Sequence, residues 1–323
     1  MIRVEKYSDK YFTKWNDFVA SSNNGTIFHR LDFLNYHGDK FASNENHLLF
    51  FKGDAIFAVM PLGIFEEGTR KIAKSPFGAS WGGLVHGMKF KLKDAIEIVT
   101  CLLDQLKQWG VDQITIGTVP MCYYSKYTNY FEFALCSAGF TLSNREVMDI
   151  VKLPESKEKV WDLLDSKCRN QTKKNLELLK INRNAPAPVF FPILVESKKK
   201  HNAVPTHNLN DLEYLKKTFP EHIKFDVGVF PDNTKAAVGY FTGNKQCTST
   251  FYLAQEEEAR NKNGLNILIY EGMVDAVEKG FTYYDFGCSS YQMKIQNYGV
   301  ADFKESFGAT GIFRDTFRYE FGN

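Results

Sequence analysis

Several features that would place a protein in a specialised class are missing from this 323-residue sequence. Its six cysteines show no Cys-x-x-Cys spacing, which favours reduced packing residues over disulfides or a zinc site. No stretch approaches the roughly 18 consecutive apolar residues of a membrane helix. The first residues, MIRVEKYSDKYF, do not combine a basic start with an apolar core, so no signal peptide is expected. We therefore expect a cytoplasmic protein without an integral membrane segment, which could act on membrane-bound molecules from the inner face.

An excess of one charge is missing too. The 40 basic and 38 acidic residues give a net charge of +2, which argues against bulk DNA binding and requires any polyanion site to be a local patch. The chain contains no nucleophile elbow, HExxH helix, P-loop or Rossmann glycine pattern. Neither a catalytic triad nor a metal site is therefore expected.

The composition that remains, 44% hydrophobic and 24% charged, is that of a soluble globular protein long enough for two domains. An order of amphipathic helix, glycine and strand occurs twice, in residues 93–117 and again in residues 265–287, with Gly110 and Gly280 ending the helices. The repeat predicts two tandem units, residues 1–153 and 185–323. Between them we expect a basic connecting helix within residues 154–184, followed by extended structure at the three prolines of residues 184–192.

The second copy of this order lies in the stretch around which the chain is organised, residues 246–308. A strand over residues 247–254 leads to a polar run that ends at Gly264, then to a helix and a short buried strand, YYDFG. The N-terminus of a helix offers unpaired N–H groups and the positive end of its dipole. The sequence therefore favours a phosphate group at the start of this helix.

This element order resembles the acyl-CoA-binding core of the GNAT acyltransferases. The tail that follows reads N-x-G-x-x-x-FKE-x-FG, which resembles the FemAB-like branch of that superfamily. Three further segments are similar to the same branch: GTIFH, SPFGASWGG, and the PTHNLNDL run of a subgroup found with surface-polysaccharide genes. The resemblance implies an α/β (α+β) fold of two tandem GNAT-like domains, each a mixed central sheet flanked by helices, and an enzyme that transfers an acyl group to an amine.

The resemblance also implies residue roles. Lys304 matches the motif lysine that stabilises charge. From its position at the end of the central strand, Tyr252 could protonate the leaving group or line the acceptor cleft. His207 is a third catalytic candidate because helix capping explains the neighbouring asparagines but not this histidine. The remaining candidates belong to the loop expected to bind the acyl donor and to the site expected to bind the acceptor. Donor-loop candidates are Asn261, Asn263, Gly264 and Leu265, and acceptor candidates are Trp81, His86, Arg169, Lys173 and Asn297.

Several of these residues also have a purely structural interpretation. Lys304 could form a surface ion pair with Asp302 or Glu305, and Tyr252 could be a packed strand residue. The glycines around Trp81 could serve only a strand bulge, His86 could be a hydrogen-bonded strand residue, and Arg169 and Lys173 could lie on a solvated helix face. Asp285, inside the buried strand, is expected to hold the fold.

The donor and the acceptor are separate questions. Most of the superfamily uses acyl-CoA, so acetyl-CoA is the expected co-substrate, although RNKNGL has one glycine where the superfamily loop reads Q/R-x-x-G-x-G/A. Aminoacyl-tRNA, with a peptidoglycan precursor as acceptor, is the alternative, but no heptad run supports the coiled-coil arm of such enzymes. The expected acceptor is an amine on a sugar nucleotide or a lipid-linked glycan precursor of the cell envelope. A third alternative is a catalytically silent glycan-binding protein, and the sequence does not determine the oligomeric state.

Overall fold

The computed structural model describes residues 1–200, 202–295 and 298–322. The chain forms two compact units. The first consists of residues 1–146 and 313–323, and the second of residues 147–312. These boundaries differ from the predicted ones in two ways. The last strand pairs with Gln113–Gly117 (β7) of the first unit, and residues 147–184 belong to the second unit. Pairing between segments so far apart in the chain is not visible in the sequence order.

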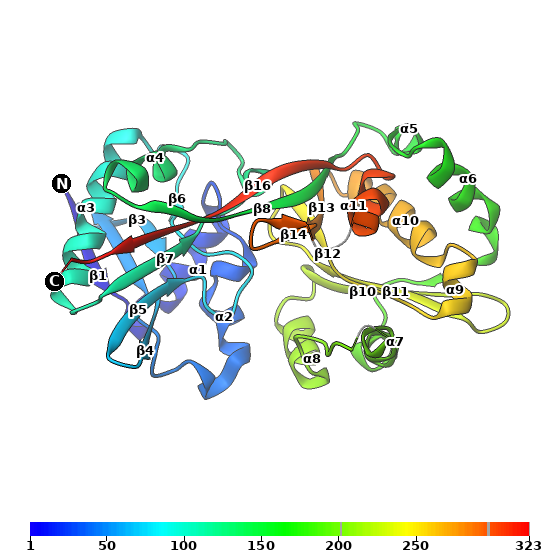
Figure 1. The fold of residues 1–323 in the computed structure, drawn as a ribbon, viewed down its shortest axis with the longest axis horizontal. Coiled ribbons are helices and arrows are strands. Elements are labelled where there is room, and N and C mark those ends of the chain that lie inside the picture. Colours follow the sequence, from blue (N-terminus) through cyan, green and yellow to red (C-terminus); the bar gives the residue numbers. More distant parts are fainter. Residues whose placement is uncertain (201, 296–297, 323) are drawn as a thin grey trace. The chain divides into compact units, whose positions relative to one another are not determined.

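The first unit contains a four-stranded sheet, β1-β2-β3-β6, and the strands β4-β5-β7-β16-β8 of a second sheet (Figure 1). The helix α3 and both sheets contribute to one apolar core. The elements are β1 Ile2–Lys6, α1 Phe12–Ser21, α2 Leu31–Leu34, β2 Leu48–Lys52, β3 Ala55–Met60, β4 Gly63–Glu67, β5 Arg70–Ser75, β6 Val85–His86, α3 Leu92–Gln108, β7 Gln113–Gly117, α4 Tyr130–Ser137, β8 Thr141–Lys152 and β16 Thr310–Glu320.

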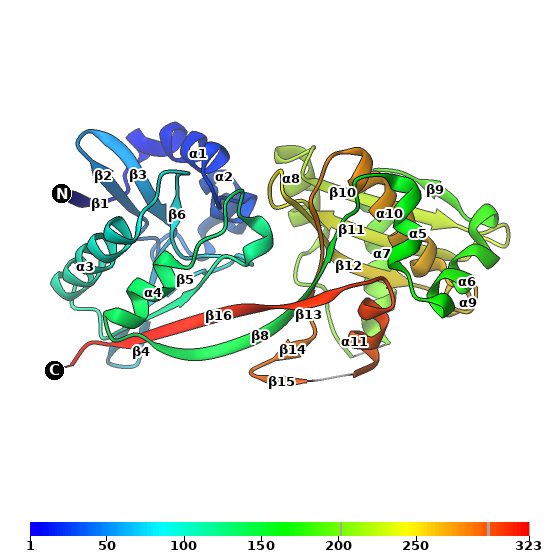
Figure 2. The same cartoon turned by 90° about the horizontal axis from the view of Figure 1, so that it is seen from above.

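The second unit is a sheet in the order β8-β13-β12-β11-β10-β9 between two helical layers. Figure 1 shows α10 on one face of the sheet and α7 and α8 on the other, and Figure 2 shows the same arrangement from above. The elements are α5 Val160–Leu163, α6 Ser166–Lys174, β9 Lys180–Asn182, α7 Ala187–Lys199, α8 Leu209–Thr218, β10 Ile223–Val229, β11 Lys235–Phe241, β12 Cys247–Gln255, α9 Glu257–Asn261, α10 Gly264–Glu278, β13 Tyr283–Cys288, β14 Ser290–Tyr291, β15 Lys294–Ile295 and α11 Tyr298–Glu305.

The predicted repeat of helix, glycine and strand is confirmed in both units. Helix α3 ends before Gly110, helix α10 ends before Gly280, and a strand follows each glycine. Both glycines have positive φ, +66° and +79°, a conformation that glycine adopts without steric cost. The turn residues Lys52-Gly53-Asp54 and Pro231-Asp232-Asn233 indicate two hairpins, and both are present, as β2–β3 and β10–β11.

The predicted connecting helix over residues 154–184 is wrong as a single helix. The chain leaves the helical conformation at Leu164 (φ −74°, ψ 137°), and Asp165 then caps α6 by accepting the Cys168 N–H at 2.6 Å. The chain leaves the helical conformation a second time at Asn175. The Asp165 side chain binds a nearby backbone N–H and so favours a new helix start even where the apolar pattern continues. Asn175 Nδ2 instead donates to Lys262 O at 3.0 Å.

The prediction of extended structure at residues 184–192 is also wrong. Helix α7 begins at Ala187, with Pro186 as its N-cap residue and Pro188 in the first turn, where no backbone N–H is required. Pro192 lies inside the helix, which buries Phe190 completely. Burial of this apolar face outweighs the loss of one backbone hydrogen bond. No helix in the described ranges is both long enough and apolar enough to cross a bilayer.

Gly272 gives a stability prediction for the second unit. A Cβ at this position of α10 would lie 2.1 Å from the Tyr240 hydroxyl and 2.9 Å from the Tyr284 hydroxyl. We expect Gly272→Ala to lower the free energy of unfolding, measured with urea, by about 1–3 kcal/mol because of overpacking. The same change in a Tyr240→Phe background should cost less, since the nearer oxygen is gone. An equal cost in both backgrounds would contradict this explanation.

Candidate functional site

The parallel strands β12 and β13 of the second unit pair over a short length and then part. Their register contains three pairs, of which Ser249 with Asp285 is the last. On its other edge β12 has a bulge: Gly239 lies opposite Tyr252 while Tyr240 lies opposite Thr250, so Phe251 is the extra residue. Beyond Ser249, backbone groups of β12 therefore face β13 without pairing to it. The opening can present a backbone N–H to a carbonyl oxygen.

A buried lysine lies at the far end of β13. Lys304, on α11, is 4% exposed, and its Nζ donates to Asp149 Oδ2 at 3.0 Å, to Gly287 O at 2.8 Å and to Cys288 O at 3.0 Å. An ammonium group has three hydrogens, and each has an acceptor here. Lys304 therefore fixes the end of β13, where this strand has left β12.

The carboxylate that accepts from this lysine is buried, and so is the neighbouring Asp285. Asp149, on β8, is 3% exposed and also accepts the hydroxyl of Ser289. Asp285, which is fully buried, accepts the Gly287 N–H at 2.5 Å in a turn where Gly287 has a φ of +73°. This contact agrees with the expected fold-holding role of Asp285. We call Lys304, Asp149, Ser289, Gly287 and Cys288 the lysine cluster.

Lys304 does not fit one of its two predicted interpretations. It is not a surface ion pair with Asp302 or Glu305, because its partner is the buried Asp149. The role of Asp149 and Ser289 was missed from the sequence. A signal for Asp149 exists, since it is a single acid in the apolar run of residues 147–151, and a buried carboxylate must be paired or protonated.

The structure brings the other two catalytic candidates together. Tyr252, on β12, is 4% exposed, and its hydroxyl lies 2.7 Å from His207 Nδ1 while accepting the His207 backbone N–H at 3.3 Å. His207 is 3% exposed and lies against the rings of Phe241 and Phe251. Burial raises the pKa of Tyr252 to about 12, so the phenol keeps its proton at neutral pH. The pair can hold or pass one proton next to the β12 bulge.

The predicted donor loop begins α10. Asn263 is its N-cap residue with a φ of +61°, the left-handed conformation that a glycine would supply in the superfamily loop. Its Nδ2 donates to Gln171 O at 3.3 Å, so α6 covers this side of the helix start. Gly264 and Leu265 are buried, which leaves only their backbone groups for a ligand, whereas Asn261 is exposed.

The acceptor candidates do not form one cluster. Trp81 and His86 belong to the first unit, where Trp81 is 6% exposed and packs under Arg314, and where His86 lines a cavity. Arg169 and Lys173 lie on α6 of the second unit. Arg169 Nη2 donates to Leu164 O at 3.2 Å, and Lys173 Nζ lies 5.1 Å from the centre of the Trp161 ring, so both have structural contacts. Asn297 lies outside the described residues.

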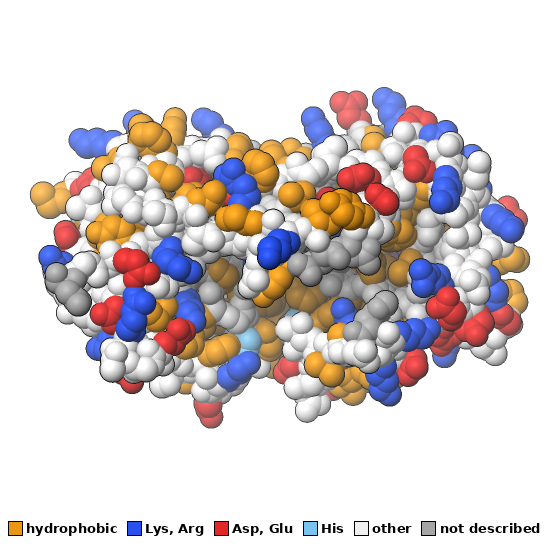
Figure 3. All heavy atoms as spheres, in the orientation of Figure 1, with side chains coloured by type: hydrophobic (Ala, Val, Ile, Leu, Met, Phe, Trp, Pro, Cys, Tyr) orange, Lys and Arg blue, Asp and Glu red, His pale blue; other side chains and the backbone are white. Residues whose placement is uncertain are grey.

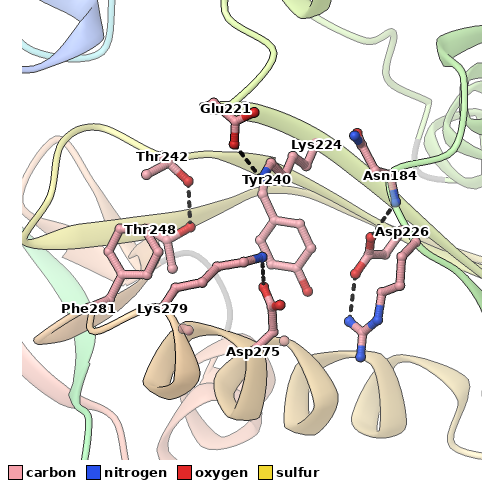
Figure 4. Close-up of a pocket in the computed structure, with 13 residues that line it drawn as sticks. Asn184, Glu221, Lys224, Asp226, Tyr240, Thr242, Thr248, Asp275, Lys279 and Phe281 are labelled. Carbon is pink, nitrogen blue, oxygen red and sulfur yellow. Dashed lines mark hydrogen bonds and ion pairs between the residues drawn. The ribbon is translucent and has the colours of Figure 1, made fainter.

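The second unit also has a cavity of about 180 Å³ between the sheet and α10, shown in Figure 4. The Tyr240 side chain points into it, and a hydrogen bond joins Thr242 to Thr248 on one side. Every Lys or Arg that lines it has an acid within ion-pair distance. The pairs are Arg183 with Asp226, Lys224 with Glu221 and Lys279 with Asp275. The cavity therefore offers little uncompensated charge to a ligand.

Lys304 gives a second prediction. Lys304→Met leaves the buried Asp149 carboxylate without its cation, and we expect a loss of about 3–5 kcal/mol in the free energy of unfolding, measured with urea. Adding Asp149→Asn should recover part of that loss, since the unpaired charge is removed. If the double variant lost as much free energy of unfolding as the two single variants together, or more, the two residues would not form a coupled ion pair.

No protein-family model matches the chain, and no curated protein matches its sequence. Solved structures do match. FemX is similar over 99% of this chain and 97% of its own, with a TM-score of 0.73 and 13% identity. The C-terminal domain of a protein described as a lysylphosphatidylglycerol synthetase, from Agrobacterium fabrum, matches with a TM-score of 0.62, 11% identity and coverage of 96% and 91%.

A tandem GNAT protein from the clavulanic acid biosynthesis pathway also matches, over 100% of this chain and 99% of its own, with a TM-score of 0.52 and 10% identity. At such identities the likeness concerns the fold. It confirms the predicted fold class: the chain is a mixed α/β protein of two tandem GNAT-like domains.

Proposed function

We propose that this protein is an N-acyltransferase that moves an acyl group from acyl-CoA to an amine on a sugar nucleotide or a lipid-linked glycan precursor of the cell envelope. The observation that supports it most directly is the opening between β12 and β13. The opening has Tyr252 and His207 on the β12 side and the lysine cluster on the β13 side.

The opening suits direct attack by an amine. The nitrogen lone pair forms a bond to the acyl carbonyl carbon, and the carbonyl oxygen becomes an oxyanion that accepts a backbone N–H of β12 beyond Ser249. The carbon–sulfur bond of the thioester then breaks, and the nitrogen gives its proton to solvent water, from which His207 later recovers the proton that it supplies. The departing thiolate takes a proton from Tyr252, which His207 replaces through the hydrogen bond of 2.7 Å.

Lys304 contributes to this proposal by positioning. Its three hydrogen bonds occupy the ammonium group, so direct contact with an oxyanion would require the loss of one of them. The lysine fixes the carbonyls of Gly287 and Cys288 and thereby the β13 side of the opening. Because the Asp149 carboxylate balances the charge of the ammonium group, the cluster can remain buried.

Asn263 supports acyl-CoA as the donor. Its left-handed backbone, followed directly by the 15-residue helix α10, reproduces the turn that brings a helix N-terminus to a phosphate. In the view of Figure 3, Lys and Arg side chains are interspersed with Asp and Glu side chains over the second unit, on the right. This face therefore has no extended positive patch of the kind that tRNA binding requires.

One observation favours aminoacyl-tRNA instead, with a peptidoglycan precursor as acceptor. Glu256, Glu257 and Glu258 directly precede the donor loop, and their negative charge disfavours a pyrophosphate there. Helix α6 presents the exposed Lys167 and Lys174 and packs against α10. A tRNA backbone is a ligand that these lysines could contact.

Calorimetric titration distinguishes the donors. We expect CoA and acetyl-CoA to bind with similar affinity, and Asn263→Pro, which excludes the left-handed conformation, to weaken both. Asn233→Pro is the matched control, because Asn233 has a φ of +65° in a surface hairpin of the same unit. Charged tRNA binding without CoA binding would overturn the acyl-CoA donor. Binding of a glycan with neither donor would indicate a silent binding protein.

The Tyr252 and His207 pair gives a kinetic prediction. Tyr252→Phe removes the phenolic proton but keeps the ring, so we expect turnover with an amine acceptor to fall by about 10²-fold or more, with little change in CoA affinity. Tyr214→Phe is the control, because it removes the same phenolic hydroxyl from an exposed position on α8 of the same unit. Unchanged turnover in Tyr252→Phe would exclude the pair from the reaction.

A further inference from the structure

A second cavity, of about 460 Å³, lies wholly within the first unit, where the segment after β6 leads into α3. Its walls are built from segments far apart in the chain, which Asn23 ties together. The Asn23 backbone N–H donates to His86 O at 2.8 Å, and its side chain exchanges two hydrogen bonds with the Lys126 backbone at 2.7 and 2.8 Å. Asn23 is 3% exposed, so the walls are held by buried contacts.

His86 lines this cavity and is 1% exposed. Its Nδ1 lies 3.0 Å from Gly87 O, which can only accept, so the hydrogen is on Nδ1 and Nε2 is a lone-pair acceptor. No described residue forms a hydrogen bond with Nε2. The ring stacks on Phe90 at 4.0 Å, which fixes its orientation. Burial lowers the pKa of His86 to about 4, so it is neutral at physiological pH.

Three lysines line the same cavity. Lys89, Lys91 and Lys126 are exposed, and none forms an ion pair with a residue that the structure describes. The nearby Asp94 carboxylate does not neutralise them, because it accepts Lys52 Nζ at 2.8 Å and the Lys91 backbone N–H at 3.1 Å. The cavity therefore has uncompensated positive charge, unlike the charge-balanced cavity of Figure 4.

The cavity also lies at the N-terminus of the 17-residue helix α3, whose first turn adds the positive end of a dipole. Two aromatic rings border it, those of Tyr127 and Tyr130, which are 49% and 42% exposed. Exposed tyrosines present flat apolar faces that stack on sugars and bases. Positive charge, a neutral acceptor and aromatic faces thus occur together.

We propose that this cavity binds a phosphorylated sugar, either free or as the ribose phosphate of a nucleotide. Lys89, Lys91 and Lys126 hold the phosphate at the start of α3, and a sugar hydroxyl donates to His86 Nε2. Tyr127 and Tyr130 flank the ring. A neutral imidazole acceptor suits a hydroxyl and repels a bare anion, so the site prefers a sugar phosphate over inorganic phosphate. This site does not depend on the acyl transfer proposed for the second unit.

The test is calorimetric titration of the full chain with glucosamine 6-phosphate, uridine 5′-monophosphate, inorganic phosphate, glucosamine and uridine. We expect one or both of the sugar phosphates to bind, and binding to weaken as salt rises. Comparison of glucosamine 6-phosphate with uridine 5′-monophosphate distinguishes a free sugar phosphate from a nucleotide. The unphosphorylated compounds should bind at least tenfold more weakly.

Two variants separate the contributions. Lys89→Glu with Lys126→Glu should weaken the phosphorylated ligands by about tenfold or more, since each removes a charge-assisted hydrogen bond. Lys14→Glu with Lys107→Glu is the control, because it makes the same charge change at exposed positions of the same unit outside the cavity. His86→Phe keeps the ring on Phe90 and should weaken sugar phosphates more than inorganic phosphate.

Three results would overturn the proposal. The first is the absence of binding by every phosphorylated probe. The second is equal weakening by the two double lysine variants, which would indicate net charge alone. The third is equal affinity for inorganic phosphate and sugar phosphates, which would indicate an adventitious ion only. If His86→Phe does not fold, as judged by circular dichroism, the lysine variants still decide between these results.

Discussion

The interaction on which the second unit depends is the buried ion pair of Lys304 and Asp149. Two opposite charges, each about 95% or more buried, remain in a protein interior only when their hydrogen-bonding groups are satisfied. Here the backbone supplies the remaining acceptors, the carbonyls of Gly287 and Cys288. The ion pair therefore links β8, β13 and α11. It fixes the path of β13, which does not pair with β12 beyond Ser249. An opening between two strands of one sheet persists because one side of it is fixed in this way.

Both units contain the order helix, glycine and strand, but the N-termini of the two helices lie in different chemical environments. Helices α3 and α10 each end before a glycine that leads into a strand. The N-terminus of each helix lies where the preceding segment of the chain ends. At α10 that N-terminus follows three glutamates and is covered on one side by Gln171. At α3 it opens on a cavity with three lysines and a neutral histidine. Equal backbone order does not produce equal chemistry, because side chains from distant segments decide the charge at each helix start.

Local patterns predicted much of the fold. Helix spacing located α3 and α10, turn residues located two hairpins, and motif order indicated the tandem arrangement. The sequence also named Tyr252, His207 and Lys304, but the pairing of the first two and the burial of the third depend on contacts across 45 and 155 residues, which no local pattern contains. The single connecting helix predicted within residues 154–184 failed because one capping aspartate outweighed the apolar periodicity. The C-terminal strand was assigned to the wrong unit because its partner, β7, lies about 200 residues earlier.

The central claim is that an acyl group occupies the opening between β12 and β13. Hydrogen exchange followed by mass spectrometry, with and without acetyl-CoA, tests it most directly. The account predicts slower exchange in the peptide that covers residues 250–255, whose amides beyond Ser249 do not pair with β13, and no change in the paired residues 223–229 of β10. The account would be contradicted if the protein acylated an amine acceptor but acetyl-CoA left hydrogen exchange in residues 250–255 unchanged and slowed it elsewhere in the second unit.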